Sequence, residues 1–285
     1  MSVNNTPFSC LMSCYYKDPV GLMKEALDSI CNQTKVPDEL VLVEDGELTA
    51  EHYDLIGEYE EKLNIKRVKI QKNKGLGNAL NKGLEVCEND LVLRMDADDI
   101  CCPTRFQKQV DFMCLNKAVD ILGSWAHVIN EQGNIIGERL APIKHGEIYN
   151  IIWSNPIIHP AVAYRKSSIM SIGSYDRRIV RRQDYDLWFR AAKEGLIFEN
   201  IPEHLLFYRF TDDYFKKNNF KVVWGQAMMG IRGLKNLEDK LPFYTYLFVC
   251  FPIFRTLVPS FMKRPINNMI RFFDPRKKVV VSNEK

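Results

Sequence analysis

The chain has 285 residues, of which 46% are hydrophobic and 26% are charged, with a formal net charge of +3 at pH 7. This composition indicates an ordinary globular protein, with one large α/β domain or one domain and an appendage. The positive charge is a C-terminal property, because residues 263–285 carry seven Lys or Arg and two acids, so residues 1–262 sum to −2. A basic surface for nucleic acid over the body of the protein is therefore excluded.

The cysteines indicate a reducing environment. The polar first residues give no secretory signal, and the eight cysteines include no Cys-x-x-Cys pair. Cys101 and Cys102 are neighbours and make a poor disulfide pair, whereas Cys10 and Cys14 fall within an apolar run, as small core residues do. We therefore expect free cysteines and a cytoplasmic protein.

Strands and helices alternate through the first 125 residues. Apolar runs predict strands over 8–14, 39–43, 65–70, 91–96 and 119–123. Apolar residues at helical spacing predict helices over 20–32, 50–63 and 76–87, and Pro103 can open a fourth. This alternation implies a mostly parallel sheet with helices on both faces, and a ligand site beyond the carboxyl ends of the strands.

Chemically distinctive side chains follow four of these strands: Tyr15, Glu44-Asp45-Gly46, Asn73-Lys74-Gly75 and Asp96-Ala97-Asp98. If the strand continues, Asp96 and Asp98 share one face and Asp99 points elsewhere. Adjacent carboxylates repel each other unless a cation lies between them, and such oxygen ligands suit Mg²⁺ or Mn²⁺ shared with substrate phosphates. The alternative is a polar loop after a strand.

The second half is less regular, with a strand expected over 161–164 and a helix that begins at Asp184 after a polar loop. Asp184 is either the N-cap of that helix or a carboxylate held at a rigid helix start, where it can act as a general base.

Residues 241–262 form an apolar, aromatic-rich segment whose only charge is Arg255, and six basic residues follow between 263 and 278. Pro252 and Pro259 interrupt the segment, so we expect no membrane-spanning helix. An aromatic segment beside a basic cluster predicts peripheral contact with an anionic membrane surface. The alternative is a helical pair that caps the domain or forms a dimer.

Residues 13–209 resemble the family 2 glycosyltransferases, which are inverting enzymes of the GT-A fold. The resemblance is nearest to bacterial enzymes of O-antigen, capsule and exopolysaccharide assembly. It rests on segments in the family's order: Ser13-Cys14-Tyr15, Ser29-Ile30-Cys31-Asn32-Gln33-Thr34, Leu42-Val43-Glu44-Asp45-Gly46, residues 73–83, Arg94-Met95-Asp96-Ala97-Asp98-Asp99-Ile100 and Asp184-Tyr185-Asp186-Leu187-Trp188.

The resemblance implies a GT-A glycosyltransferase domain over 1–212 and a helical, membrane-associating extension over 213–285. The implied activity is transfer from a UDP-sugar to a hydroxyl of a polyprenyl-diphosphate-linked or growing polysaccharide acceptor. It belongs to surface-polysaccharide biosynthesis at the cytoplasmic face of the bacterial inner membrane, with β1,3-galactosyl transfer as the favoured linkage.

Site roles follow from the same resemblance. Tyr15 and Asp45 would hold the uracil, and Asp96 would contact the ribose and the metal. Asp98 would be the principal ligand of Mn²⁺ or Mg²⁺, and Asp184 would be the general base. The remaining expected nucleotide-sugar contacts are Ser13, Gly75 and Asn81. His159 either contacts the acceptor or diphosphate or hydrogen-bonds within its loop, and Trp188 lies either in the helix core or beneath a sugar.

The chain also departs from the family's pattern. Gln183 replaces a frequent Glu before Asp184, Leu80 replaces a frequent Arg before Asn81, and Thr211 stands where many relatives have a metal-ligating His. A sugar-nucleotide pyrophosphorylase is disfavoured because no Gly-rich basic loop follows the first strand. The remaining alternative is a catalytically inactive membrane-bound scaffold of a polysaccharide-assembly complex.

Overall fold

A computed structural model describes residues 6–210 and 220–257. The strands are β1 (Ser9–Cys14), β2 (Glu39–Asp45), β3 (Ile65–Ile70), β4 (Leu91–Asp96), β5 (Ile100–Cys101), β6 (Ile121–Ile129), β7 (Ile135–Arg139), β8 (Ala163–Arg165) and β9 (Phe198–Arg209). The helices are α1 (Val20–Cys31), α2 (Ala50–Glu60), α3 (Leu76–Val86), α4 (Arg105–Leu115), α5 (His145–Asn150), α6 (Lys166–Ser171), α7 (Gln183–Lys193), α9 (Phe220–Asn236) and α10 (Tyr244–Leu257), with short 3₁₀ turns η2 (Ile152–Ser154) and η3 (His159–Ala161).

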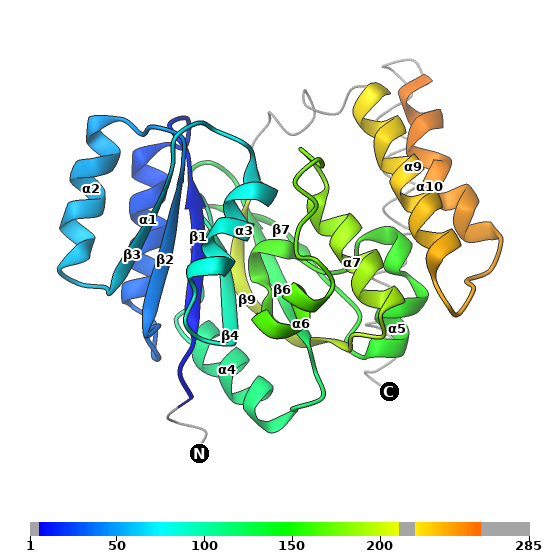
Figure 1. The fold of residues 1–285 in the computed structure, drawn as a ribbon, viewed down its shortest axis with the longest axis horizontal. Coiled ribbons are helices and arrows are strands. Elements are labelled where there is room, and N and C mark those ends of the chain that lie inside the picture. The colour runs from blue at the N-terminus through cyan, green and yellow to red at the C-terminus, as the bar shows by residue number, and fades with distance from the viewer. Residues whose placement is uncertain (1–5, 211–219, 258–285) are drawn as a thin grey trace.

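These elements form one sheet in the order β3-β2-β1-β4-β8-β6-β9-β5, with β7 paired to β6 (Figure 1). The strands β3, β2, β1 and β4 are parallel, as the alternation predicts, and β6 and β9 are also parallel. The short strand β8 is antiparallel to both β4 and β6, so it joins the parallel strands β3, β2, β1 and β4 to the parallel pair β6 and β9. The strands β5 and β7 are antiparallel to their neighbours β9 and β6. The α/β fold with a mostly parallel, helix-flanked sheet is confirmed.

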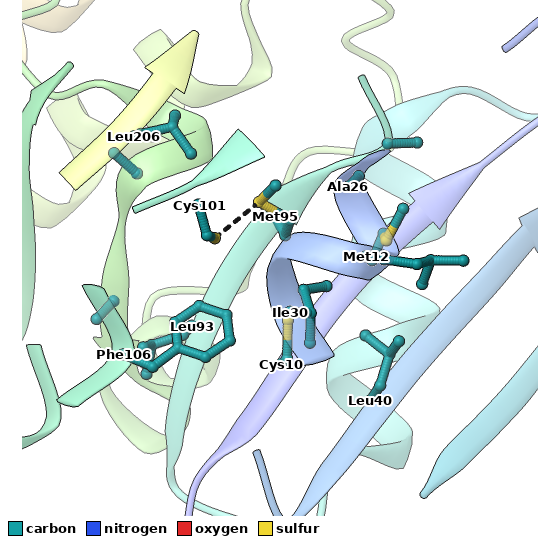
Figure 2. Close-up of a cluster of buried hydrophobic side chains, with 14 of the residues drawn as sticks. Cys10, Met12, Ala26, Ile30, Leu40, Leu93, Met95, Cys101, Phe106 and Leu206 are labelled. Atoms are coloured by element: carbon teal, nitrogen blue, oxygen red, sulfur yellow. Dashed lines mark hydrogen bonds between the residues drawn. The ribbon is translucent and has the colours of Figure 1, made fainter. Parts of the chain in front are cut away.

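Both faces of the sheet carry apolar core. Figure 2 shows Cys10 and Met12 of β1 close to Ala26 and Ile30 of α1, with Met95 of β4 beside them. The intervening residue Leu11 points to the other face, where it packs in the cluster that contains α3 and α7. Strands apolar on both faces are typical of a sheet covered by helices on each side. Cys10 and Cys14 are buried as expected, and all eight cysteines are free.

The C-terminal helices pack against this domain. Figure 1 shows α9 and α10 side by side at the end of the molecule remote from α2. Helix α9 contacts α7 through its glycines, because a Cβ at Gly230 would lie 2.7 Å from the Tyr185 hydroxyl and a Cβ at Gly233 would overlap the Phe189 ring. Ala227 and Leu234 of α9 belong to the same core cluster as the α7 side chains.

The described helices contain no segment that is both long and apolar enough to span a membrane. The basic residues between 263 and 278 lie outside the described residues, so their membrane role stays a prediction.

We predict opposite effects for two alanine substitutions within α9. Gly233→Ala should lower the free energy of unfolding by about 1–3 kcal/mol, because the added methyl overpacks a rigid aromatic ring. Gly225→Ala is the matched control, since its Cβ would meet nothing within 4 Å, and it should stabilise α9 by about 0.5–1 kcal/mol. Urea unfolding of both variants measures this difference. Equal effects would show that α9 does not dock tightly on α7.

Candidate active site

The predicted ligand-binding residues lie at one edge of the sheet. Ser13 of β1 is in register with Asp96 of β4, and Cys14 is in register with Glu44 of β2. Tyr15 and Asp45 directly follow this last pair. The carboxyl ends of three neighbouring parallel strands therefore bring an aromatic ring and carboxylates to a common edge, as the order of motifs predicts.

Three carboxylates converge where β4 ends. Oxygen atoms of Asp96, Asp98 and Asp99 all lie within 4.8 Å of one another. The expectation that Asp99 points elsewhere is wrong, because the strand stops at Asp96 and residues 97 and 98 form a turn. In this turn the side chains no longer alternate between the two faces of the sheet, so the carboxylate of Asp99 lies with those of Asp96 and Asp98.

Burial makes this cluster electrostatically costly. The pKa of Asp98 is raised from 3.8 to about 6, first by burial and then by Asp96. The pKa of Asp99, which is 1% exposed, is raised well above its usual value by burial and by Asp98. Asp99 Oδ2 has no hydrogen-bond partner among the described residues. A dense set of desolvated oxygen donors fits a hard divalent cation such as Mn²⁺ or Mg²⁺.

A buried arginine compensates part of this charge. Arg94 is 1% exposed, and its Nη2 donates to Asp96 Oδ1. Its Nε and Nη1 atoms have no partner within the described part of the chain. The Arg94 backbone is held in turn, because Arg105 Nη2 donates to the Arg94 carbonyl oxygen at 2.6 Å. Arg94 therefore places a fixed positive charge directly beneath Asp96.

A second arginine, Arg209 at the end of β9, holds the carboxylate turn from the other side. Its backbone N–H donates to Asp99 Oδ1 at 2.7 Å, and its Nε donates to the Asp98 carbonyl oxygen at 2.7 Å. Its Nη1 donates to the carbonyl oxygens of residues 130 and 131, and its Nη2 donates to Glu25 Oε2 at 2.5 Å. The side chain thus joins the turn, the β6–β7 hairpin and α1. Thr211, which stands where many relatives have a metal-ligating His, lies outside the described residues.

Asp45 has a structural task that its motif does not reveal. Its two carboxylate oxygens accept the backbone N–H groups of Lys74 and Gly75, each at 2.9 Å. Gly75 has a φ of +87°, a conformation that favours glycine, and precedes α3. Asp45 therefore positions the loop before α3. Each of its oxygens retains a further lone pair that could accept from a uracil, and that contact stays a prediction.

Asp184 is the second residue of α7 and not its N-cap. Arg182 occupies the N-cap position with a left-handed φ of 63°, so the N-cap alternative is wrong. Asp184 Oδ2 accepts a hydrogen bond of 2.8 Å from Asn155 Nδ2. The N-terminus of α7 and the Asn155 amide both place partial positive charge beside the Asp184 carboxylate. Asn155 is a positioning residue that the sequence analysis missed, although its left-handed φ of 55° is typical of Asn in a turn.

Tyr175 links the two acidic parts of the site. Burial is the main cause of the raised pKa of its phenol, and the negative charges of Asp184 and Asp96 raise that pKa further. Asn81 holds the Tyr175 backbone at both its N–H, 2.9 Å from Asn81 Oδ1, and its carbonyl oxygen, 2.7 Å from Asn81 Nδ2. The predicted nucleotide contact of Asn81 is untested, and in this structure its amide fixes Tyr175.

His159 lies inside this cluster. Its Nε2 is 2.7 Å from the Tyr175 hydroxyl, and it is 8% exposed. Burial, and then Arg94, lower its pKa well below the usual value, so the ring is neutral near pH 7. This geometry matches the hydrogen-bonding interpretation of His159. Trp188 is fully buried, so it belongs to the helix core and not to a sugar platform.

A further carboxylate was not foreseen from the sequence. Asp18 accepts the Tyr15 N–H at 2.9 Å, in a turn that closes β1. Its pKa is raised from 3.8 to about 7, mainly by burial, with added repulsion from Asp98 and Asp96. Asp18 therefore lies close enough to the carboxylate turn to add to its negative potential.

We predict that Asp98→Asn stabilises the metal-free protein at neutral pH. In the folded state the Asp98 carboxyl has a pKa of about 6 instead of 3.8. The folded form thus binds this proton more tightly than the unfolded chain, and the associated stability is lost as pH rises through 6. The variant should gain on the order of 1–3 kcal/mol at pH 7.5, and the gain should shrink between pH 6 and pH 4.

Thermal unfolding with a chelator measures this gain. Added Mn²⁺ should then raise the Tm of the wild type more than that of the variant. A gain that does not depend on pH would contradict the electrostatic explanation.

Comparisons with known proteins identify the family to which a chain with this site belongs. A model described as "Glycosyl transferase family 2" matches residues 9–189. The UDP-Gal:alpha-D-GlcNAc-diphosphoundecaprenol beta-1,3-galactosyltransferase of Escherichia coli is 37% identical over 221 residues, covering 76% of this chain and 79% of that protein. The amylovoran biosynthesis glycosyltransferase AmsE of Erwinia amylovora is 36% identical over 211 residues, covering 74% of this chain and 79% of that protein.

Solved structures agree on the fold. The crystal structure of S. aureus TarS residues 1–349 in complex with UDP-GlcNAc superposes with a TM-score of 0.65 at 16% identity, covering 88% of this chain and 72% of that one. The family match covers more than half of the chain and all of the elements that carry the carboxylate turn and Asp184. The chain is a glycosyltransferase that belongs to family 2.

Proposed function

We propose that this glycosyltransferase moves a sugar, with inversion, from a UDP-sugar to a hydroxyl of a lipid-diphosphate-linked or growing polysaccharide acceptor. The observation that carries the proposal is the carboxylate turn, where oxygens of Asp96, Asp98 and Asp99 lie within 4.8 Å of one another beside the carboxyl end of β1. The second acidic group is Asp184 in the first turn of α7. One group suits a cation on a diphosphate and the other suits an attacking hydroxyl. Relatives named for O-antigen and amylovoran biosynthesis support polysaccharide assembly as the context.

A UDP-linked donor is supported by the crystal structures of TarS in complex with UDP and with UDP-GlcNAc. In this chain the uracil ring would lie between Tyr15 and Asp45. There the carboxylates of Asp18 and Asp45 accept the backbone N–H groups of Tyr15 and Gly75 and hold both segments in place. Ser13 and Asp96 lie side by side, in register on adjacent strands, and would contact the ribose.

Asp98 and Asp96 would hold Mn²⁺ or Mg²⁺, with Asp99 completing the oxygen set. When bound, such a cation supplies Lewis-acid neutralisation of the departing diphosphate. The protein's own contribution is to keep the carboxylates aimed at one point before substrate arrives, because Arg94 and Arg209 hold both ends of the turn. That preorganisation avoids reorganisation during the reaction.

Asp184 would accept the proton of the acceptor hydroxyl as its oxygen attacks the anomeric carbon. The Asn155 hydrogen bond of 2.8 Å to Oδ2 fixes the orientation of the carboxylate. A single displacement with the base opposite the leaving group inverts the anomeric configuration. An α-linked donor would give a β-linked product, in agreement with the name of the E. coli relative, a beta-1,3-galactosyltransferase.

A lipid-linked acceptor would bring the enzyme to a membrane surface. The exposed apolar side chains of α9, α10 and the preceding turn include Trp224 at 50%, Phe243 at 78% and Leu247 at 63% exposure. Aromatic and aliphatic side chains exposed on paired helices suit insertion at the headgroup boundary. This exposed face supports peripheral association with the cytoplasmic side of the bacterial inner membrane.

The decisive experiment for the proposed function is transfer from a panel of UDP-sugars to GlcNAc- and GalNAc-diphosphate lipids, with and without chelator. Asp184→Asn should lower kcat by about 10²–10⁴, because the general base is lost, while the Kd for UDP stays near that of the wild type. Asp186→Asn is the matched control on the same helix, since that carboxylate pairs with Arg190 at 2.8 Å. Near-wild-type transfer by Asp184→Asn would remove Asp184 as the base.

Membrane association has its own test. Replacing Phe243 and Leu247 with Ser should reduce sedimentation with vesicles that contain anionic lipid, because apolar burial at the headgroup boundary is lost. The control Leu115→Ser changes an exposed leucine, 71% exposed, on the distant helix α4. Unchanged sedimentation of the Phe243 and Leu247 double variant would show that these helices do not contact the bilayer.

A further inference from the structure

Four aromatic or imidazole side chains form a row on β6 and β9 that none of the proposed roles uses. Trp125 of β6 is in register with His204 of β9, and His127 of β6 is in register with Phe207 of β9. These four residues, here named the ring row, are all half-buried, so part of each remains open to solvent. Such rings on a strand surface suit a ligand that is partly apolar and partly polar.

His127 is the middle ring of the row. Its centroid lies 4.3 Å from that of His204, with the planes 11° apart, and 5.3 Å from that of Phe207, with the planes 26° apart. Among the described residues, His127 is the only ring against Phe207. Because Phe207 follows His204 along β9, its outer face, away from His127, is turned toward the end of that strand.

The end of the row remote from Phe207 is fixed by neighbouring segments. Trp125 Nε1 donates to the Ala141 carbonyl oxygen at 2.8 Å, and the Trp125 ring lies edge-on to His204 with centroids 5.6 Å apart. His204 Nε2 lies 3.3 Å from Glu138 Oε2 of β7. The row is therefore held in place before a ligand arrives, which limits the conformational entropy that binding has to remove.

The open end of the row lies beside the carboxylate turn. Phe207 is in register with Ile100 of β5, which directly follows Asp99. Residues opposite each other on antiparallel strands have Cα atoms about 5 Å apart. Two residues after Phe207, the Arg209 N–H donates to Asp99 Oδ1 at 2.7 Å. A ligand on the outer face of Phe207 would therefore border the turn at which the donor diphosphate is proposed to bind.

The ring row also shares a face of the sheet with the proposed base. Ala126 of β6 and Met95 of β4 belong to the core that contains α1 and α4. By strand alternation their neighbours His127 and Asp96 point to the opposite face, which α7 with Asp184 covers. In the sheet, β8 separates β4 from β6, so these two strands are about 10 Å apart. The carboxylate turn, the base and the row thus surround one region.

A sugar has the mixed chemistry that this row offers. The C–H groups of a pyranose ring pack on an aromatic face, because that face is the negative part of the aromatic ring. Its hydroxyl groups both donate and accept hydrogen bonds, and a neutral imidazole has one nitrogen of each kind. Burial, and then His204, lower the pKa of His127, so its ring is neutral near pH 7.

We propose that the ring row binds the sugar of the acceptor, with the sugar ring stacked on the outer face of Phe207 and a hydroxyl group hydrogen-bonded to His127. This inference rests on the proposed function, because it assigns a subsite for the acceptor of that reaction. The attacking hydroxyl then lies on the face of the sheet that carries Asp184. Selection of the acceptor sugar thus belongs to β6 and β9, apart from the strand ends proposed to hold the nucleotide.

The test compares Phe207→Leu with Phe207→Tyr in transfer to the GlcNAc- and GalNAc-diphosphate lipids. Leucine stays apolar but lacks the aromatic face, so Phe207→Leu should raise the KM for the acceptor by about three- to tenfold. Phe207→Tyr should stay near the wild type, and the KM for the UDP-sugar should change in neither variant. Phe112→Leu is the matched control, since Phe112 of α4 is also half-buried but packs against the core on the other face.

A binding measurement without turnover separates this proposal from the proposed function. The chain has five histidines, so their imidazole nitrogens can be labelled with ¹⁵N, and His127→Gln assigns the signal of His127. The methyl glycosides of GlcNAc and GalNAc should shift this signal in the metal-free wild type and shift it less in Phe207→Leu. Inactive wild-type protein that shows the shift would count against the proposed function and not against the subsite.

Three results would each overturn the proposal. They are the same acceptor KM in Phe207→Leu and Phe112→Leu, a rise in the KM for the UDP-sugar instead of the acceptor, and a His127 signal that neither glycoside shifts. The second result would place the donor's sugar on the row. If Phe207→Leu loses UDP binding because it misfolds, His127→Gln takes its place in the KM comparison, with the same rise in acceptor KM expected.

Discussion

The mutual repulsion of buried carboxylates is the constraint on which the rest of this structure depends. Asp96, Asp98 and Asp99 are gathered within 4.8 Å, and burial raises the pKa of both Asp98 and Asp99. Nothing in the apolar core favours such a gathering. It persists because two buried arginines oppose it, Arg94 from within the sheet and Arg209 from the end of β9. Keeping these oxygen ligands together therefore lowers the free energy of unfolding, a cost that substrate-binding sites commonly carry.

The two arginines differ in kind. Arg94 is a charge beneath one carboxylate, with two nitrogen atoms that lack partners among the described residues. Arg209 ties three segments together, since its groups reach the carboxylate turn, Glu25 on α1 and the hairpin after β6. Replacing Arg209 would release the turn from β9 and would remove a positive charge that partly offsets the effects of burial and of Asp96 on the pKa of Asp98, whereas replacing Arg94 would alter the field at Asp96. Arg209 thus supplies both rigidity and charge to the turn, and Arg94 supplies charge.

Much of this was predictable from the sequence, and the failures have a common cause. Runs such as 39–43 and 91–96 predict strands, because a strand in a sheet covered by helices on both faces is apolar along its whole length. The alternation of these runs with helices predicts that neighbouring strands are parallel. The strand expected over 161–164 is present as β8, Ala163–Arg165, but its antiparallel direction leaves no local signature in the sequence. Asp99 was misplaced because alternation was extended past Asp96, where a turn begins. Asp18, Asn155 and Arg209 act through contacts between residues distant in sequence or through turns, which periodicity does not report.

The proposed base depends on parts of the chain far beyond its own motif. Asp184 is fixed by α7, and α7 is covered by α9 through Gly230, beside which the Tyr185 hydroxyl also donates to the Trp153 carbonyl oxygen at 2.7 Å. That same region carries Asn155, whose amide holds the Asp184 carboxylate. Helix α9 therefore supports the helix that carries Asp184. An apolar outer face on α9 and α10, if it meets a membrane, would bring the bilayer surface and the proposed base into one rigid arrangement, because α9 packs on α7 and α10 packs on α9.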